Sequence, residues 1–130
     1  MNNTAISAYF EKGKISLLTR DISSESIPWT PHPQFPGVFL KHLVKGVETG
    51  GNLSCHMVRV EPNCTLKEHI HDGKLEIHEI VEGSGTCTLD GRTIPYSVGS
   101  IAVIPSNIKH EVIAGNEGIY ILAKFSPALL

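Results

Sequence analysis

Four residues between positions 69 and 110 have side chains that commonly bind metal ions. His69 and His71 are two residues apart, so on a β-strand both imidazoles would point to the same face. Glu76 follows a turn, which can bring its carboxylate back across the two histidines on an antiparallel neighbour. His110 comes directly after a second predicted turn, over residues 105–109, where a new strand begins. Three imidazoles and one carboxylate favour Fe, Ni, Zn, Cu or Mn over Ca or Mg.

The elements that would position these side chains are mostly β-strands. Gly and Pro, 20 residues out of 130, interrupt almost every window after residue 12, so only residues 5–12 are expected to form a helix. Short strands with evenly spaced turns are typical of a closed barrel or a double-sheet jelly roll. The predicted strands are 38–44, 53–60, 66–71, 76–81, 86–89, 92–96, 101–104, 110–114 and 119–125.

The chain has room for one compact domain. It consists of two regions that differ in amino-acid composition. Residues 1–37 are expected to form an N-terminal arm, and residues 38–130 the barrel domain. The arm contains a segment with four prolines and the only tryptophan, Trp29. Trp29 and Phe35 have large apolar side chains, which usually pack against a core or a partner, so we expect an ordered arm. A disordered linker is the alternative.

Alternate residues of a β-strand point to the same face, and this alternation (strand parity) predicts which further side chains lie in a pocket beside the ligands. If Glu76 faces the interior, His78 and Ile80 do so too. A two-residue turn at Gly83–Ser84 would pair Ile80 with Cys87, and directly opposed residues share a face. His78 and Cys87 are therefore predicted to line a substrate pocket, although a three-residue turn would reverse this register. His78 either transfers protons near the metal or only donates and accepts hydrogen bonds.

The remaining histidines and one arginine are less informative. His56 lies on a strand whose two faces are both largely apolar, so parity leaves its direction open. Arg59 on the same strand could anchor an anionic substrate or lie at a rim or interface. His32 and His42 belong to no cluster in the sequence, and we interpret both as structural.

Two motifs together resemble a known family. Residues 69–83 read HIHDGKLEIHEIVEG and match H-x-H-x4-E-x6-G, the first motif of the cupin superfamily. Residues 99–110 read GSIAVIPSNIKH and match the second motif, G-x5-P-x-G-x2-H, except that Asn107 replaces the glycine. Asn tolerates left-handed backbone geometry, so Asn107 can still form the turn. The usual terminal Asn of the motif would fall at Ala114, which also departs from the pattern.

The resemblance implies an all-β fold, a cupin-type, RmlC-like double-sheet jelly-roll barrel with an N-terminal arm. It implies one divalent transition metal (Fe, Ni, Zn, Mn or Co) bound by His69, His71, Glu76 and His110. The expected function is a metal-dependent enzyme, of oxidoreductase (dioxygenase) or lyase type, acting on a small polar molecule. The alternatives are a non-catalytic small-molecule binding or sensor cupin, and a storage cupin. The fold does not select the reaction.

Composition narrows the partners and the compartment. Lys and Arg total 11 against 13 Asp and Glu, a formal net charge of -2, so no positive field favours nucleic acid. Apolar runs are far shorter than the roughly 20 residues of a membrane-spanning helix. The N-terminus does not resemble a secretory signal, so we expect a cytoplasmic protein. The three cysteines form no C-x-x-C pair, which favours reduced thiols.

A homodimer is also expected. Residues 37–43 and 119–130 are apolar on both strand faces, which a solvated antiparallel strand would not be. Residues 27–44 and the C-terminal end are predicted to supply much of the contact, and cupins commonly pair by packing their barrels. In the competing arrangement, the arm folds back on its own barrel.

Overall fold

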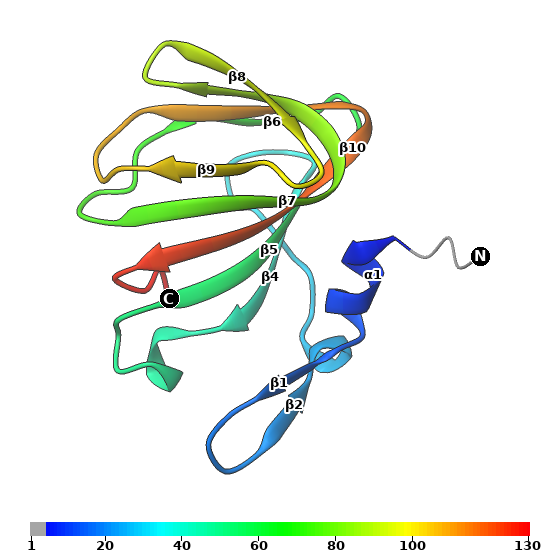
Figure 1. Cartoon of the computed structure of the whole chain (residues 1–130), viewed down its shortest axis with the longest axis vertical. Coiled ribbons are helices and arrows are strands. Elements are labelled where there is room, and N and C mark those ends of the chain that lie inside the picture. Colours follow the sequence, from blue (N-terminus) through cyan, green and yellow to red (C-terminus); the bar gives the residue numbers. More distant parts are fainter. Residues whose placement is uncertain (1–4) are drawn as a thin grey trace.

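The computed structural model describes residues 5–130 and consists mainly of antiparallel strands (Figure 1). Most strand positions agree closely with the predicted ones, because alternating burial and turn residues mark their ends. The predicted strands 76–81 and 86–89 form one continuous strand, as do 110–114 and 119–125, and the strand predicted over 66–71 ends at His69. The elements, in chain order, are α1 (Ile6–Glu11), β1 (Lys14–Ser16), β2 (Asp21–Ser23), η1 (Ser24–Ser26), β3 (Thr30–Pro31), β4 (Val38–Val44), η2 (Gly46–Glu48), β5 (Ser54–Val60), β6 (Thr65–His69), β7 (Leu75–Leu89), β8 (Arg92–Ser97), β9 (Ile101–Ile104) and β10 (His110–Ser126).

The two longest strands, β7 and β10, bend from one sheet into the other. Their halves 75–83 and 119–126 pair with each other between β5 and β9, and the pairing continues through β4 to β3. Their other halves pair with each other between β6 and β8. The strands thus form two sheets joined by β7 and β10, which confirms the predicted double-sheet jelly roll.

The turn predicted at Gly83–Ser84 is wrong, because β7 runs through this point without reversing. Ile80 pairs with Ile121, and Cys87 pairs with Val112 on β10. Gly83 has φ of 76°, and a Cβ there would lie 2.1 Å from the carbonyl oxygen of Gly118. The glycine therefore permits a close crossing of two backbones where the sequence pattern suggested a hairpin.

The core lies between the two sheets. Ile80 and Cys87 are both buried in it, so both face the interior as expected, although they do not pair. The side chains that fill this interior are mainly β-branched or small, which suits packing between pleated surfaces. They include Val38, Val58, Val60, Leu66, Ile80, Cys87, Tyr96, Val112, Ile119, Ile121 and Phe125.

The N-terminal arm packs against the barrel of its own chain. Within it, β1 and β2 form a hairpin (Figure 1). β3 pairs with β4 and so extends the sheet that contains β4 and β5, which is called the main sheet below. Trp29 and Ile27 pack on Leu43, Met57 and Leu122, which form an apolar cluster on the outer face of that sheet. The arm therefore covers part of the surface that the sequence pattern suggested for a partner.

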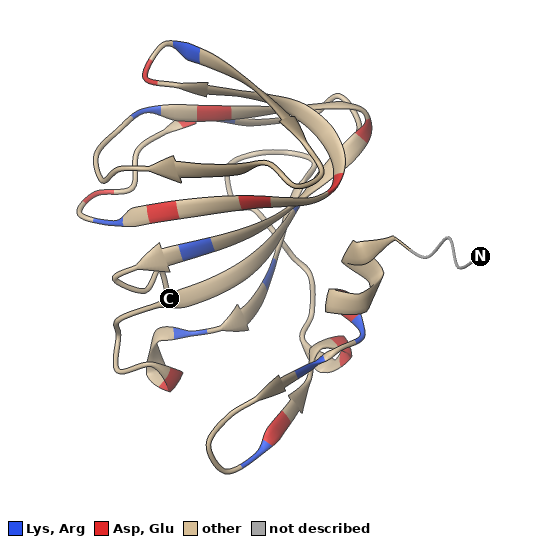
Figure 2. Ribbon diagram, viewed as in Figure 1, with Lys and Arg blue, Asp and Glu red and all other residues tan. Residues whose placement is uncertain are grey.

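Charged side chains are spread over the described surface. Acidic and basic residues are interspersed along the strands and turns (Figure 2), in keeping with the formal net charge of -2. Within residues 5–130, no helix combines the length and apolar character needed to cross a membrane.

Candidate metal centre

The four predicted metal ligands lie together inside the barrel. His69 ends β6, His71 lies in the following turn, Glu76 begins β7 and His110 begins β10. The Nε2 atoms of His69 and His71 are 3.1 Å apart. Oε1 of Glu76 lies 3.6 Å from Nε2 of His71 and 3.1 Å from Nε2 of His110. The three histidines offer nitrogen atoms that all lie within 4.8 Å of one another, so this triad could hold a metal ion.

Backbone hydrogen bonds orient two of these rings. Nδ1 of His69 lies 2.6 Å from the carbonyl oxygen of Lys67, and Nδ1 of His110 lies 3.1 Å from that of Ile108. A carbonyl oxygen only accepts, so Nδ1 carries the proton in both rings. The neutral ring then has its lone pair on Nε2, the nitrogen that faces the other ligands.

Two polar atoms at the centre have no hydrogen-bond partner among residues 5–130. They are Oε1 of Glu76 and Nε2 of His110, which are close but not aligned for a hydrogen bond. Both side chains are buried. A buried polar atom without a partner costs free energy, and two that converge on one point fit the binding of a cation between them. The donor set of nitrogen and carboxylate oxygen suits a transition metal.

A buried chain of hydrogen bonds supports Glu76 from behind. Its second oxygen, Oε2, accepts a hydrogen bond of 2.9 Å from Nε2 of His78. Nδ1 of the same ring therefore accepts from the hydroxyl of Tyr96, at 2.8 Å. The Tyr96 hydroxyl in turn contacts the thiol of Cys87. This chain fixes the carboxylate so that Oε1 alone faces the histidines.

Ionisation of Glu76 and His69 favours metal binding at neutral pH. Burial alone would raise the pKa of Glu76, but the imidazoles of His78, His110 and His71 around the carboxylate bring it well below its usual range. Burial lowers the pKa of His69 to about 4, partly offset by its hydrogen bond to Lys67. Glu76 is therefore charged and His69 neutral, which are the forms that bind metals. At His110, the effect of burial is outweighed by contact with Glu76, which raises the pKa.

A small cavity of about 50 Å³ opens beside the ligands. His78 and Cys87 do not line it, since both lie behind Glu76. The walls are largely apolar, with two further histidines from the arm and from β5. The lining residues are His32, Leu40, His56, Val58, Leu66, His69, His71, Glu76, Phe125 and Leu129.

His42 and His56 form a second histidine cluster, so His42 belongs to a cluster that the sequence does not reveal. They oppose each other on β4 and β5, with their Nδ1 atoms 2.8 Å apart. Nε2 of His56 lies 2.7 Å from the hydroxyl of Ser54. His56 is fully buried, so its direction, which parity left open, is towards the interior. His32 also belongs to a cluster, because it lines the cavity with the ligands.

Arg59 faces away from the cavity. Its guanidinium lies 4.7 Å from the ring centres of both Trp29 and Phe39, and its Nε is 3.8 Å from Glu61. These contacts tie the arm to the outer face of the main sheet, so the structure supports the rim position considered for Arg59.

Two structural contributions to the site were absent from the sequence argument. Tyr96 was placed on a strand but not connected to the ligands, because nothing in the sequence indicates a contact 20 residues from Glu76. Leu129 lines the same cavity as three of the ligands. The C-terminal end, which is predicted to supply a dimer contact, therefore also lies beside the ligands.

The turn before His110 agrees with the prediction. Asn107 has φ of 66°, the left-handed geometry expected where a glycine is usual. Its side-chain oxygen accepts a hydrogen bond of 3.0 Å from the backbone of Gly73. Asn107 thus links the turn before His110 to the turn that carries His71.

Comparison with known proteins agrees with this fold. The family model of the cupin domain matches residues 56–122, about half of the chain. Dimethylsulfoniopropionate lyase DddW of Ruegeria pomeroyi is 26% identical over 128 residues, which cover 96% of this chain and 84% of that protein.

Two solved structures share the architecture. A predicted oxalate decarboxylase from Thermotoga maritima aligns with a TM-score of 0.74 and 21% identity, covering 82% of this chain and 97% of the other. An RmlC-like cupin from Shewanella frigidimarina aligns with a TM-score of 0.70 and 18% identity, covering 81% and 87%. At these identities the likeness shows the fold alone. With its jelly roll and the match of the family model, this chain belongs to the cupin domain family.

Proposed function

We propose that this cupin is a metal-dependent lyase that acts on a small anionic molecule. One divalent transition metal would be held by His69, His71, Glu76 and His110. The observation that carries the proposal is the pair of buried, unpartnered atoms on Glu76 and His110, which converge where a cation would satisfy both.

Charge at the site favours an anion as the substrate. Three neutral imidazoles and one carboxylate around a divalent ion leave a single positive charge in the cavity. The other lining residues are apolar or are histidines outside the ligand set. A small carboxylate would neutralise that charge while its carbon atoms contact the apolar wall.

The reaction class rests on the relative that aligns over most of the chain. That protein is named a dimethylsulfoniopropionate lyase, and its named substrate contains a carboxylate group. A bound divalent metal would act as a Lewis acid towards a carboxylate oxygen. The residues of this chain would exclude water through the apolar walls, and His78, held by Tyr96, would keep Glu76 in place. This assigns His78 to positioning and leaves it outside the cavity.

A non-catalytic sensor is the second candidate, and one observation favours it. Both ring nitrogens of His56, a cavity residue outside the ligand set, already have hydrogen-bond partners. A ligand could then be held at the metal without a ready proton acceptor beside it.

Metal analysis and turnover assays test the proposal. Purified protein should contain about one transition metal per chain, and the metal-loaded form should convert dimethylsulfoniopropionate or another small carboxylate to an unsaturated acid, followed by chromatography. Oxygen uptake on the same panel tests the dioxygenase alternative. His110→Ala is the control without a complete ligand set. Metal binding with no turnover would favour the sensor, and a protein that takes up no metal would overturn the proposal.

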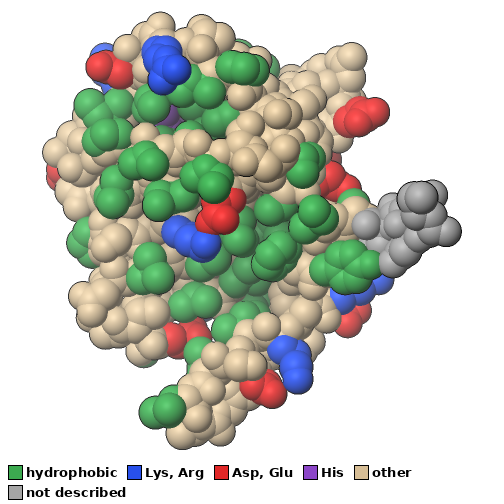
Figure 3. Space-filling view, in the orientation of Figure 1, with side chains coloured by type: hydrophobic (Ala, Val, Ile, Leu, Met, Phe, Trp, Pro, Cys, Tyr) green, Lys and Arg blue, Asp and Glu red, His purple; other side chains and the backbone are tan. Residues whose placement is uncertain are grey.

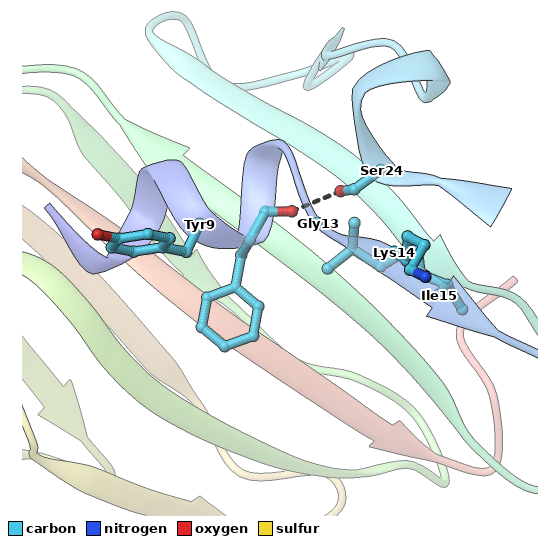
Figure 4. A pocket seen from close by; sticks show the side chains of 7 residues that line it. Tyr9, Gly13, Lys14, Ile15 and Ser24 are labelled. Carbon is cyan, nitrogen blue, oxygen red and sulfur yellow. Dashed lines mark hydrogen bonds between the residues drawn. The ribbon is translucent and has the colours of Figure 1, made fainter. Parts of the chain in front are cut away.

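We also propose a homodimer, formed through a groove that lies between the N-terminal arm and Leu43 of β4. Hydrophobic side chains gather beside the N-terminal segment (Figure 3). There, Tyr9, Phe10, Ile15 and Leu43 help to line a groove of about 240 Å³ next to α1 (Figure 4). Phe10→Asp should convert a dimer to a monomer in light scattering. Leu18→Asp, at the fully exposed tip of the hairpin, is the matched control.

A further inference from the structure

His32 carries a fixed ring proton. Its Nδ1 accepts hydrogen bonds from two backbone N–H groups, those of Gln34 at 3.1 Å and Phe35 at 3.3 Å. A nitrogen that accepts from two donors cannot itself carry a proton, so the neutral ring is protonated at Nε2. Burial also lowers the pKa of His32, which keeps the ring neutral. Nε2 is therefore a hydrogen-bond donor throughout the neutral pH range, and within residues 5–130 no partner takes it up.

The surroundings of His32 hold the ring in place. Pro31 and Pro33 flank it, and its own backbone N–H donates to the carbonyl of Val38 at 2.8 Å. The ring stacks on Phe35 with centroids 4.5 Å apart and planes 15° apart. Such a ring loses little further conformational freedom when it forms a contact with a ligand.

This ring lines the cavity of the candidate metal centre. Phe35, on which it stacks, lies 6.0 Å from the ring of His69. The other cavity residue outside the ligand set with a polar side chain is His56, whose two nitrogens are already bonded. Among the described cavity residues outside the ligand set, His32 is thus the one with a donor still available for a ligand.

We propose that His32 is a substrate-binding residue, which donates a hydrogen bond from Nε2 to a small carboxylate held at the metal. The inference rests on the proposed function and deepens it, because it names the group on the arm that recognises the anion. A neutral donor at the cavity wall complements the positive charge of the metal-loaded centre without adding to it. The N-terminal arm would then be part of the binding site as well as a cover for the outer face.

Two substitutions separate the donor from the support that His32 gives to its loop. In His32→Asn, the side-chain oxygen replaces Nδ1 and can still accept from the N–H groups of Gln34 and Phe35, but the Nε2 donor is lost. In His32→Gln, the amide nitrogen replaces Nε2 as a donor, but the Nδ1 acceptor is lost. The probe is acetate, titrated into the Co²⁺-loaded proteins and followed by the visible absorption of the cobalt. Co²⁺ content is measured first for each protein.

The expected result is equal Co²⁺ content, acetate binding about tenfold weaker in His32→Asn, and binding within about threefold of wild type in His32→Gln. Wild-type affinity in His32→Asn would overturn the inference. Equal weakening in both variants would also overturn it, since His32 would then act through its loop. Wild-type protein that takes up no Co²⁺ would instead overturn the proposed function and the inference with it.

Discussion

Two histidine clusters lie in one barrel, and they differ in what their polar atoms contact. In the pair of His42 and His56, each Nδ1 faces the other and Ser54 bonds the remaining nitrogen of the buried ring. At the candidate metal centre, Glu76 and His110 each leave a buried atom without a partner among residues 5–130. The first cluster satisfies its own hydrogen bonds, and the second does not.

The contrast teaches how to recognise a metal site in a structure without a bound ion. Both clusters combine buried and half-buried histidines, so burial does not separate them. What separates them is convergence of unpartnered atoms, since only in the second cluster would a cation supply the partners that buried lone pairs lack.

The largest effect is expected from removing a ligand. His69→Ala or His110→Ala should lose most of the bound metal, because each removes one donor from a set of four. His42→Ala is the matched control, since it removes a histidine that is hydrogen-bonded to His56 and lies outside the ligand set. This variant should keep about one metal per chain. Metal analysis by mass spectrometry after dialysis checks all three. Full occupancy in a His69→Ala/His110→Ala double mutant would contradict the assignment of the site.

A smaller loss of metal affinity is expected from changing Tyr96, which contacts the ligand Glu76 only through His78. Tyr96→Phe removes the hydroxyl that fixes His78, so Glu76 should lose part of its orientation and metal affinity should fall about 10-fold to 100-fold. Tyr120→Phe makes the same chemical change on the outer face of the main sheet and should leave the affinity unchanged. Competition with a chromophoric chelator measures both. If the two variants bind metal equally well, the Tyr96 hydroxyl does not position the centre.

The sequence predicted the strands well and their connections less well. Burial periodicity and turn residues mark β4, β5 and β9 almost to the residue because they are local properties. The continuity of β7 through Gly83 depends on the close approach of Gly118, a contact between residues far apart in the chain. Glycine in a sequence indicates either a turn or a close crossing, and only the tertiary structure decides between them.

The candidate site likewise combines residues that local motifs predict with residues that only the tertiary structure brings together. His69, His71, Glu76 and His110 could be grouped because motif spacing encodes them. Tyr96, His32 and Leu129 reach the site from β8, the arm and the C-terminal end, and no spacing connects those segments to the motifs. Contacts that depend on how distant elements pack cannot be read from local patterns.

The pH dependence of the free energy of unfolding should reflect the hydrogen-bonded pair of His42 and His56. Burial, and then the charge of His42, lower the pKa of His56 from 6.5 to about 4, while Glu76 raises it slightly. The unfolded chain therefore binds a proton near pH 6.5 that the folded chain does not. His56 thus adds stability above pH 6.5 that is lost as the pH falls towards 4.

Thermal unfolding in the presence of a chelator tests this prediction. The melting temperature of wild-type protein should fall between pH 6.5 and 4, and that of His56→Leu should fall less steeply over the same range. The absolute melting temperature of the variant is expected to be lower, because His42 and Ser54 lose their partner. Parallel pH profiles for the two proteins would show that His56 is not the titrating group.

The smallest effect concerns the C-terminal end, where two adjacent leucines make different contacts. Leu129 lines the cavity and packs against the core, whereas the side chain of Leu130 is 55% exposed. The backbone N–H of Leu129 donates to Ser54 at 2.8 Å, and alanine keeps this bond. Leu129→Ala should therefore lower stability by about 1 to 2 kcal/mol, or a few degrees in melting temperature, through lost apolar contact alone. Leu130→Ala should change it little. Neither substitution removes a ligand, so both proteins should retain the metal; loss of metal from Leu129→Ala would mean that the cavity wall also supports the centre.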